Sequence, residues 1–169
     1  MAKHAVVRTD NMYGTTVGAA LVSIKYMGSD GNTPTEIDNG NILKVGTLMD
    51  GEREVRVGAA PTASDKITDI VLIAAPEVMY DERLKNLDDF YNEAGKIIRG
   101  YRLHSGDIFS VTKEALTGKT DIAKDDVVEL TAGTKLNVAA SATKDSTVVG
   151  KIIAIDIVGR HTYYVISVD

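Results

Sequence analysis

The chain has 169 residues, of which 44% are hydrophobic and 25% are charged, and its formal net charge is -5. This length suits one ordinary domain or two small β modules that share a core, and the hydrophobic content argues against disorder throughout. The negative charge and the lack of a basic run argue against a nucleic-acid partner, because phosphate contacts need clustered Lys and Arg. The absence of cysteine excludes disulfides, thiolate metal sites and cysteine nucleophiles.

The amino-terminal sequence MAKHAVVRTDNMYG lacks the apolar segment that follows the basic residues of a signal peptide. No apolar run approaches the roughly 18 residues of a membrane-spanning helix, so we expect no membrane partner. Residues 1–16 show little periodicity and are predicted to form an extended N-terminal arm. Such an arm either frays in solution or lies on a neighbouring subunit.

Residues 17–79 are predicted to form a first β-rich module. Alternating or small apolar residues indicate strands within 17–28, 37–46 and 52–60. The segment 67–76 (ITDIVLIAAP) is short and almost continuously apolar, which is typical of a strand buried on both faces. Strands at such short spacing favour a small antiparallel sandwich or barrel.

A connector at residues 80–95 interrupts the strand pattern. Asp81 is a candidate helix N-cap and Gly95 is a candidate stop. Between them, Leu84 and Leu87 begin an apolar stripe at helical spacing. We predict one short helix here, although an ordered irregular crossing fits the same residues. The carboxylates of this segment are interpreted as a solvated face and not as an acid–base pair.

Residues 96–169 are predicted to form a second β-rich module. Strand patterns cover 96–112, and a strand, a tight turn and a second strand are expected over 127–140. The clearest hairpin is 148–169, in which two alternating runs meet at a Gly-Arg turn. The predicted fold is therefore mainly β, built from small antiparallel β-barrel or sandwich modules with one short helix and an extended N-terminal arm.

Two pairs of segments repeat in the same order. The stretch IDNGNILKVG (37–46) aligns without a gap with LHSGDIFSVT (103–112), and AAPTASDKITDIV (59–71) shares its pattern with AASATKDSTVVGK (139–151). Two such repeats in one order suggest duplicated modules. Turn chemistry alone can recreate similar strings, because Gly, Asn and Asp are favoured wherever a strand follows a tight turn.

The sequence offers no catalytic motif. Residues 116–120 (LTGKT) end like a phosphate-binding loop, but Lys113 stands where that loop requires its first glycine. The histidines His4, His104 and His161 lack the close helical spacing of a metal-binding pair. The Ser and Asp residues beside His104 are the ordinary choice for a turn that leads into a strand. We therefore expect no enzymatic activity, no cofactor and no metal ion.

Four stretches carry a family resemblance: APEVMYDERLKNLDDFYNEAGKIIRGYRLHSGDIFSVTKEALTG, VVELTAGTKLNVAAS, VVGKIIAID and TYYVISV. Together they resemble the capsid decoration proteins, also called head auxiliary or cement proteins, of tailed phages that infect Gram-positive bacteria. The resemblance extends from residue 37 to the end of the chain and consists of strand and turn patterns.

This resemblance implies a structural virion protein. Such a module is made in the host bacterial cytoplasm, docks on the outer face of the capsid and stabilises it by bridging capsomers. Its implied partner is the major capsid protein, and further copies of the chain are a second candidate partner. The family brings no catalytic residues, so none is assigned here.

Interface candidates follow from residue type and position. Within the arm they are Arg8, Met12 and Tyr13, since this segment could add as an edge strand to a neighbour. Further along the chain, Arg and aromatic residues of the types enriched in interfaces gather at Arg83, Tyr91, Arg99 and Tyr101. Phe90, in the same region, is expected in the core.

Two other classes of protein remain open from the sequence. A phage tail or baseplate module would use the same β pattern and would differ by assembling into rings or tubes. A small β-barrel enzyme would need a convergent pocket near His104 or His161.

Overall fold

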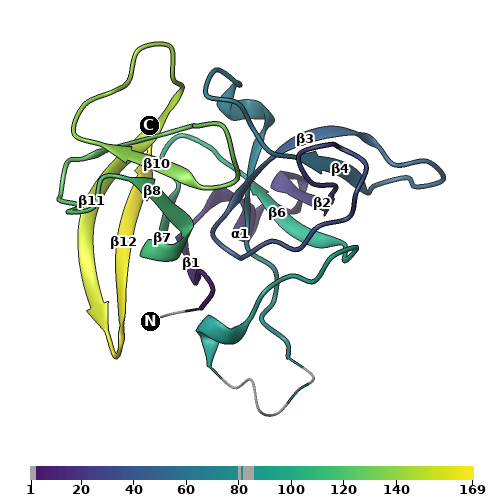
Figure 1. The fold of residues 1–169 in the computed structure, drawn as a ribbon, viewed down its shortest axis with the longest axis horizontal. Coiled ribbons are helices and arrows are strands. Elements are labelled where there is room, and N and C mark those ends of the chain that lie inside the picture. The colour runs from purple at the N-terminus through teal and green to yellow at the C-terminus, as the bar shows by residue number, and fades with distance from the viewer. Residues whose placement is uncertain (1–2, 80, 82–85) are drawn as a thin grey trace.

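The computed structural model describes residues 3–79, 81 and 86–169, and these form two β structures that lie side by side (Figure 1). One is a closed barrel with the strand order β2-β4-β3-β5-β6. The other is a curled seven-stranded sheet with the order β1-β7-β12-β11-β9-β10-β8. The fold is therefore mainly β and contains a small barrel, as the sequence predicts.

Most of the strands are short. The barrel is formed by β2 (Leu21–Tyr26), β3 (Ile42–Leu48), β4 (Arg56–Ala59), β5 (Ile70–Ile73) and β6 (Ile98–Arg102). The sheet is formed by β1 (Val7–Asn11), β7 (Ile108–Thr112), β8 (Leu116–Gly118), β9 (Val127–Glu129), β10 (Leu136–Ala139), β11 (Val148–Val158) and β12 (His161–Val168). Single-turn helices in the described chain are α1 (Tyr13–Thr16), η1 (Gly18–Ala20), η2 (Ile67–Asp69), η3 (Leu87–Asp89) and η4 (Lys113–Ala115).

The connector is irregular where the structure describes it. Its described part contains the single turn η3 and an isolated bridge between Asn92 and Ile37. The α-helical turn of the described chain is α1, in the segment that the sequence assigns to the arm. Leu84, one of the residues that predicts a helix, lies outside the described residues.

The boundaries of the two β structures differ from the expected modules in two places. The sequence assigns β6 to the second module, but β6 pairs with β2 and β5 and closes the barrel. Residues 7–11, expected as part of an arm, pair as β1 with β7 of their own chain. Both corrections arise from long-range strand pairing, which a local pattern of side chains does not encode.

Strand β5 is buried on both faces, as its sequence predicts. All four of its residues are 0% exposed. Ile70 and Leu72 belong to a large core cluster shared with the sheet, whereas Val71 and Ile73 belong to a smaller cluster of barrel residues. Because one strand contributes to both cores, the barrel and the sheet form one folded unit.

Hydrogen bonds also cross from the barrel to the sheet. The backbone N–H of Ile42 donates to the carbonyl oxygen of Thr134 at 2.7 Å, and that of Thr147 donates to the carbonyl oxygen of Ala63 at 2.8 Å. These bonds satisfy backbone groups beside the shared core, where an unpaired polar group would be costly.

The strand pairing of the barrel recurs in the sheet. In the barrel, β2 is parallel to β4 and antiparallel to β6, and β3 lies between β4 and β5. In the sheet, β8 is parallel to β10, β7 is antiparallel to β12, and β9 lies between β10 and β11. Strands β7 and β8 therefore act as two halves of one strand position, interrupted by η4. The two β structures share one topology.

The strand registers identify the sequence repeat that corresponds to this topology. Arg56 of β4 pairs with Ile24, and Leu136 of β10 pairs with Leu116. Leu136 lies 80 residues after Arg56 (136 − 56), and the same offset separates the segments that begin at residues 59 and 139 (139 − 59). This second repeat therefore aligns equivalent strands.

The first repeat has a different origin, because it aligns β3 with β7, which hold different positions. Gly40 and Gly106 have φ angles of 84° and 90°, in the left-handed region that favours glycine. Each is followed by a buried polar residue, Asn41 or Asp107. The Asp107 carboxylate accepts a hydrogen bond from the backbone N–H of Tyr13 at 2.7 Å. This repeat reflects the same turn chemistry used twice.

The sheet also contains a buried carboxylate, Glu129 on β9, which is 1% exposed. Burial alone would raise its pKa, but hydrogen bonds from Thr143 and Asn137 outweigh this effect and lower the pKa. Thr143 donates from its hydroxyl at 2.6 Å and from its backbone N–H at 2.8 Å, and the Asn137 amide donates at 2.8 Å. The folded protein therefore stabilises the ionised form.

We predict that Leu72→Ala lowers the free energy of unfolding by about 2–5 kcal/mol, because it leaves a cavity in the core that the barrel and the sheet share. Urea unfolding followed by circular dichroism and tyrosine fluorescence should still give one transition. Leu48→Ala is the control, since Leu48 is 42% exposed and its truncation should change stability by no more than about 0.5 kcal/mol. Two separate transitions would contradict the shared core.

We predict a pH-dependent contribution from Glu129. Its folded-state pKa is lowered, so its stabilising effect should be present above the ordinary pKa of 4.5 and decline as the pH falls through the lowered value. Thermal unfolding of the wild type and of Glu129→Gln across this range checks the prediction. The difference in stability should be largest near neutral pH and shrink in acid, and a pH-independent difference would refute it.

Candidate interaction surfaces

The described part of the chain contains no group of three or more His, Asp or Glu side chains placed to hold a metal ion. The three histidines make separate contacts. The Nδ1 atom of His4 lies 2.8 Å from the Asp38 carboxylate, and the ring of His104 packs on Tyr13 with a centroid distance of 4.5 Å. His161 lies at the start of β12.

The N-terminal interface candidates have partners within their own chain. The Arg8 guanidinium lies 5.0 Å from the ring centroid of Tyr163 and 3.1 Å from the Asp10 carboxylate. Tyr13 is 49% exposed and remains accessible. Met12 is only 2% exposed, which corrects its assignment as a contact residue. The pairing of β1 with β7 brings Met12 into the core that the barrel and the sheet share.

The later candidates occupy different environments. Tyr101 is 8% exposed and belongs to the core, so its assignment as a contact residue is also corrected. Tyr91 is half-buried and stacks on His4. Arg83 lies outside the described residues. Arg99 is exposed on β6, and Phe90 is buried at 6% exposure, in the core environment that the sequence predicts.

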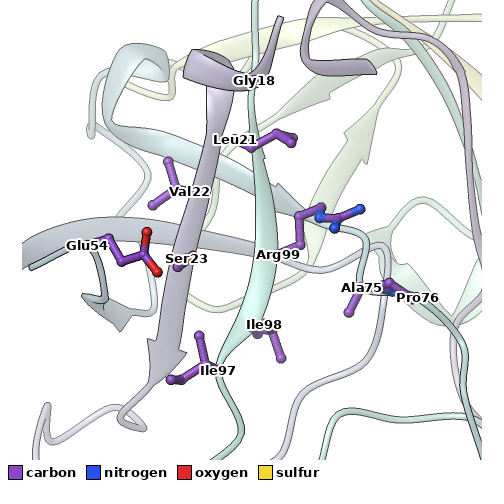
Figure 2. Close-up of a pocket in the computed structure, with 10 residues that line it drawn as sticks. All are labelled: Gly18, Leu21, Val22, Ser23, Glu54, Ala75, Pro76, Ile97, Ile98 and Arg99. Carbon is purple, nitrogen blue, oxygen red and sulfur yellow. The ribbon is translucent and has the colours of Figure 1, made fainter. Parts of the chain in front are cut away.

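An open groove of about 450 Å³ lies over β2 and β6 (Figure 2). Leu21, Ile97 and Pro76 supply apolar surface, and Arg99 and Glu54 supply the charges. In Figure 2 the Arg99 side chain extends to the same side of β6 as Ala75 and Pro76, and Glu54 lies on the other side of β2. Within the described chain, the Arg99 guanidinium makes no ion pair. Arg99 is therefore a basic side chain without an ion-pair partner among the described residues, in a groove that also contains the Glu54 carboxylate.

A second groove, of about 200 Å³, adjoins the first and shares Ala75, Pro76 and Arg99 with it. Its other walls include Val7 and Thr9 of β1. Arg99 lines both grooves. We call the two neighbouring grooves together the Arg99 trough, and its principal residues are Leu21, Ile97, Pro76, Arg99, Val7 and Thr9.

The hairpin of β11 and β12 extends along one side of the molecule (Figure 1). It carries exposed apolar side chains. Ile155 is 41% exposed, Ile157 is 79% exposed and Val158 is 52% exposed. Ile155 and Ile157 lie two residues apart on β11 and therefore point to the same face. The apolar side chains on this face do not pack into the core of the described residues.

The same part of β11 has an open hydrogen-bonding edge. Strand β9 pairs with β11 only between Val148 and Lys151. From Ile153 to Val158, β11 pairs with β12 on one side and has no strand neighbour on the other within the described residues. We call this segment the β11 edge. An apolar strand edge of this kind is a template for pairing with another chain.

The sequence predicts this hairpin but does not identify its exposed isoleucines as an interface. The stretch IIAIDIV (152–158) contains Asp156 as its single charged residue. Apolar residues stand on both faces of this strand, whereas a strand buried on one side needs them on one face only. This excess of apolar residues is the feature of the sequence from which an interface could have been predicted.

No family model matches the chain, no curated protein matches its sequence, and no solved structure matches its fold. None of the helices in the described residues has the length and hydrophobicity needed to span a lipid bilayer. The functional argument therefore depends on the surfaces themselves.

We predict that Met12→Ala lowers the free energy of unfolding by about 2–5 kcal/mol, because it empties a core position. Its neighbour Tyr13 offers a matched control: Tyr13→Ala removes a side chain that is 49% exposed and should cost no more than about 1 kcal/mol. Chemical denaturation of both variants measures the contrast. Equal, small effects would mean that the N-terminal segment does not pack on the core.

Proposed function

We propose that this chain is a structural virion protein that docks on the outer surface of a tailed-phage capsid and stabilises it by bridging capsomers. The observation that carries the proposal is the β11 edge, an open apolar strand on a hairpin that extends from a compact core. The sequence resemblance to capsid decoration proteins supports the same role and makes the major capsid protein the proposed partner.

The β11 edge suits attachment to a large protein lattice. An added strand would satisfy its open backbone groups, and main-chain pairing of this kind tolerates many partner sequences. The exposed side chains of Ile155 and Ile157 would be removed from water at the same time, with a gain of about 25 cal/mol per Å² of buried apolar surface. Attachment would therefore combine hydrogen bonding with apolar burial.

The remainder of the fold is rigid, as a protein that stabilises a capsid must be. The barrel is closed, so its strands present few free edges, and it shares a core with the sheet through β5. A rigid body with open edges at defined places binds in a defined orientation, because little conformational freedom is lost on docking. The negative net charge favours solubility before docking.

A phage tail or baseplate module could use the same edge. No feature of the described surface favours that role over the capsid, since both require a rigid β body with an open strand. The experiment below separates these locations by offering the protein heads and tails independently.

We predict that the purified protein co-sediments with undecorated heads of the phage that encodes it, and that Ile155→Lys with Ile157→Lys reduces this binding at least tenfold. Lysine at an edge strand adds charge and opposes pairing. Leu48→Lys is the control, because Leu48 is 42% exposed on the barrel and similar in exposure to Ile155.

Three results would count against the proposal. If the wild-type protein does not bind heads, the capsid role is wrong. If it binds purified tails and not heads, the protein belongs to the tail. Equal binding by the double variant and the Leu48 control would remove the β11 edge as the attachment surface.

A further inference from the structure

We infer that the Arg99 trough receives an extended segment of the major capsid protein that carries an acidic side chain, and that this contact is distinct from the β11 edge. The inference rests on the proposed function for the identity of the partner. The occupant itself follows from three features of the trough: the Arg99 guanidinium without an ion-pair partner, the open strand edge of β1 and the fixed position of that edge.

The positive charge belongs to Arg99, which lines both grooves. Arg99 is opposite Ser23 in the pairing of β6 with β2, and both residues line the trough. The guanidinium is exposed and makes no ion pair with the described residues. A carboxylate is the planar partner that a guanidinium binds through two parallel hydrogen bonds. Arg99 therefore favours an acidic side chain in the bound segment.

The open strand edge lies along the second groove. Val7 is the first residue of β1 and lies between Val6 and Arg8, and the Val6 carbonyl oxygen accepts a hydrogen bond from the backbone N–H of Thr112. In an antiparallel ladder, alternate residues direct their backbone groups to opposite sides. The backbone groups of Val7 therefore point away from β7, toward the groove that Val7 lines. An extended peptide placed there would extend the sheet by one strand.

The strand β1 is already fixed in place. Besides its pairing with β7, it is held by Arg8 over the Tyr163 ring and by the Ser110 hydroxyl, which donates to the Asp10 carboxylate. The chain just after β1 is held by the bond from Tyr13 N–H to Asp107. An edge that is preformed loses little conformational entropy when a partner binds.

The acidic residues of the trough define the rest of the partner. Glu54 lines the first groove, and Glu77 lines the second. Partial loss of hydration raises the pKa of the Glu77 carboxyl, and a hydrogen bond donated by Asn39 partly offsets this effect. The best match is a segment whose acidic residue faces Arg99, with basic or hydroxyl side chains on either side. A uniformly acidic peptide would be repelled at both ends.

The test is a titration of undecorated heads with wild-type protein and with Arg99→Glu, read by co-sedimentation. The variant loses a charge-assisted contact and gains a repulsion, so the protein concentration needed for half-saturation of the heads should rise by about 10–100-fold. Lys124→Glu is the control: Lys124 is exposed near the start of β9, outside the trough, and this variant changes the net charge by the same amount. It should bind like the wild type.

A second variant keeps the inference testable if Arg99→Glu folds poorly. Ser23 lies on β2, next to Arg99 of β6. Ser23→Trp should therefore fill the trough and weaken binding while Arg99 is retained. Thermal unfolding of each variant checks the fold. Heads that bind both trough variants as tightly as the wild type overturn this inference and leave the proposed function intact, whereas wild-type protein that fails to bind heads overturns both.

The absence of cysteine allows the occupant to be identified directly. Ser23→Cys, labelled with a benzophenone maleimide and irradiated on purified heads, should cross-link to an extended acidic segment of the major capsid protein. Mass spectrometry of the cross-linked peptide locates that segment. Cross-linking to another copy of this chain, or to a capsid segment without an acidic residue, would overturn the assignment of the occupant.

Discussion

The burial of β5 on both faces is the constraint on which the rest of the structure depends. Ile70 and Leu72 pack toward the sheet, and Val71 and Ile73 pack within the barrel. A strand with apolar residues at every position has no face to offer to water, so it must lie between two layers. The barrel on one side and the curled sheet on the other supply those layers. The five-stranded barrel and the seven-stranded sheet thereby become one rigid body, and the position of every surface strand is fixed relative to this shared core.

Closure of the barrel leaves the open edges of the fold at a few defined places. The second β structure repeats the barrel's topology, but η4 splits its first strand position, and β1 adds at one side while β11 continues past the end of β9. The β11 edge and the part of the Arg99 trough that borders β1 lie at these departures from the repeated pattern. Open strand edges are normally avoided in soluble proteins because they invite association. Their presence here, together with an Arg99 guanidinium that makes no ion pair among the described residues, supports the proposed attachment to other chains.

Part of the candidate surface could be predicted from the sequence. Arg99 was identified from residue type alone and lies in a groove, whereas Met12 and Tyr101, selected by the same reasoning, are buried. Residue type does not distinguish these cases, because Met, Tyr and Arg are enriched in interfaces while Met and Tyr also fill cores. The distinction depends on which strand covers each side chain. Likewise, the isoleucines of β11 follow a normal strand pattern, and only the early end of β9 leaves them uncovered.

The sequence by itself determined the strand-rich class, the double burial of β5, the turns at Gly40 and Gly106 and the hairpin formed by β11 and β12, because each is encoded by neighbouring residues. Tertiary structure decided that β6 closes the barrel, that residues 7–11 join the sheet, and that Val7 and Arg99 share one trough. These outcomes depend on pairing between segments separated by up to about a hundred residues, where backbone hydrogen bonds are similar for many partners. Which strands pair is decided by the total apolar surface that the whole arrangement buries. This total depends on residues from the entire chain, so no local stretch of sequence specifies it.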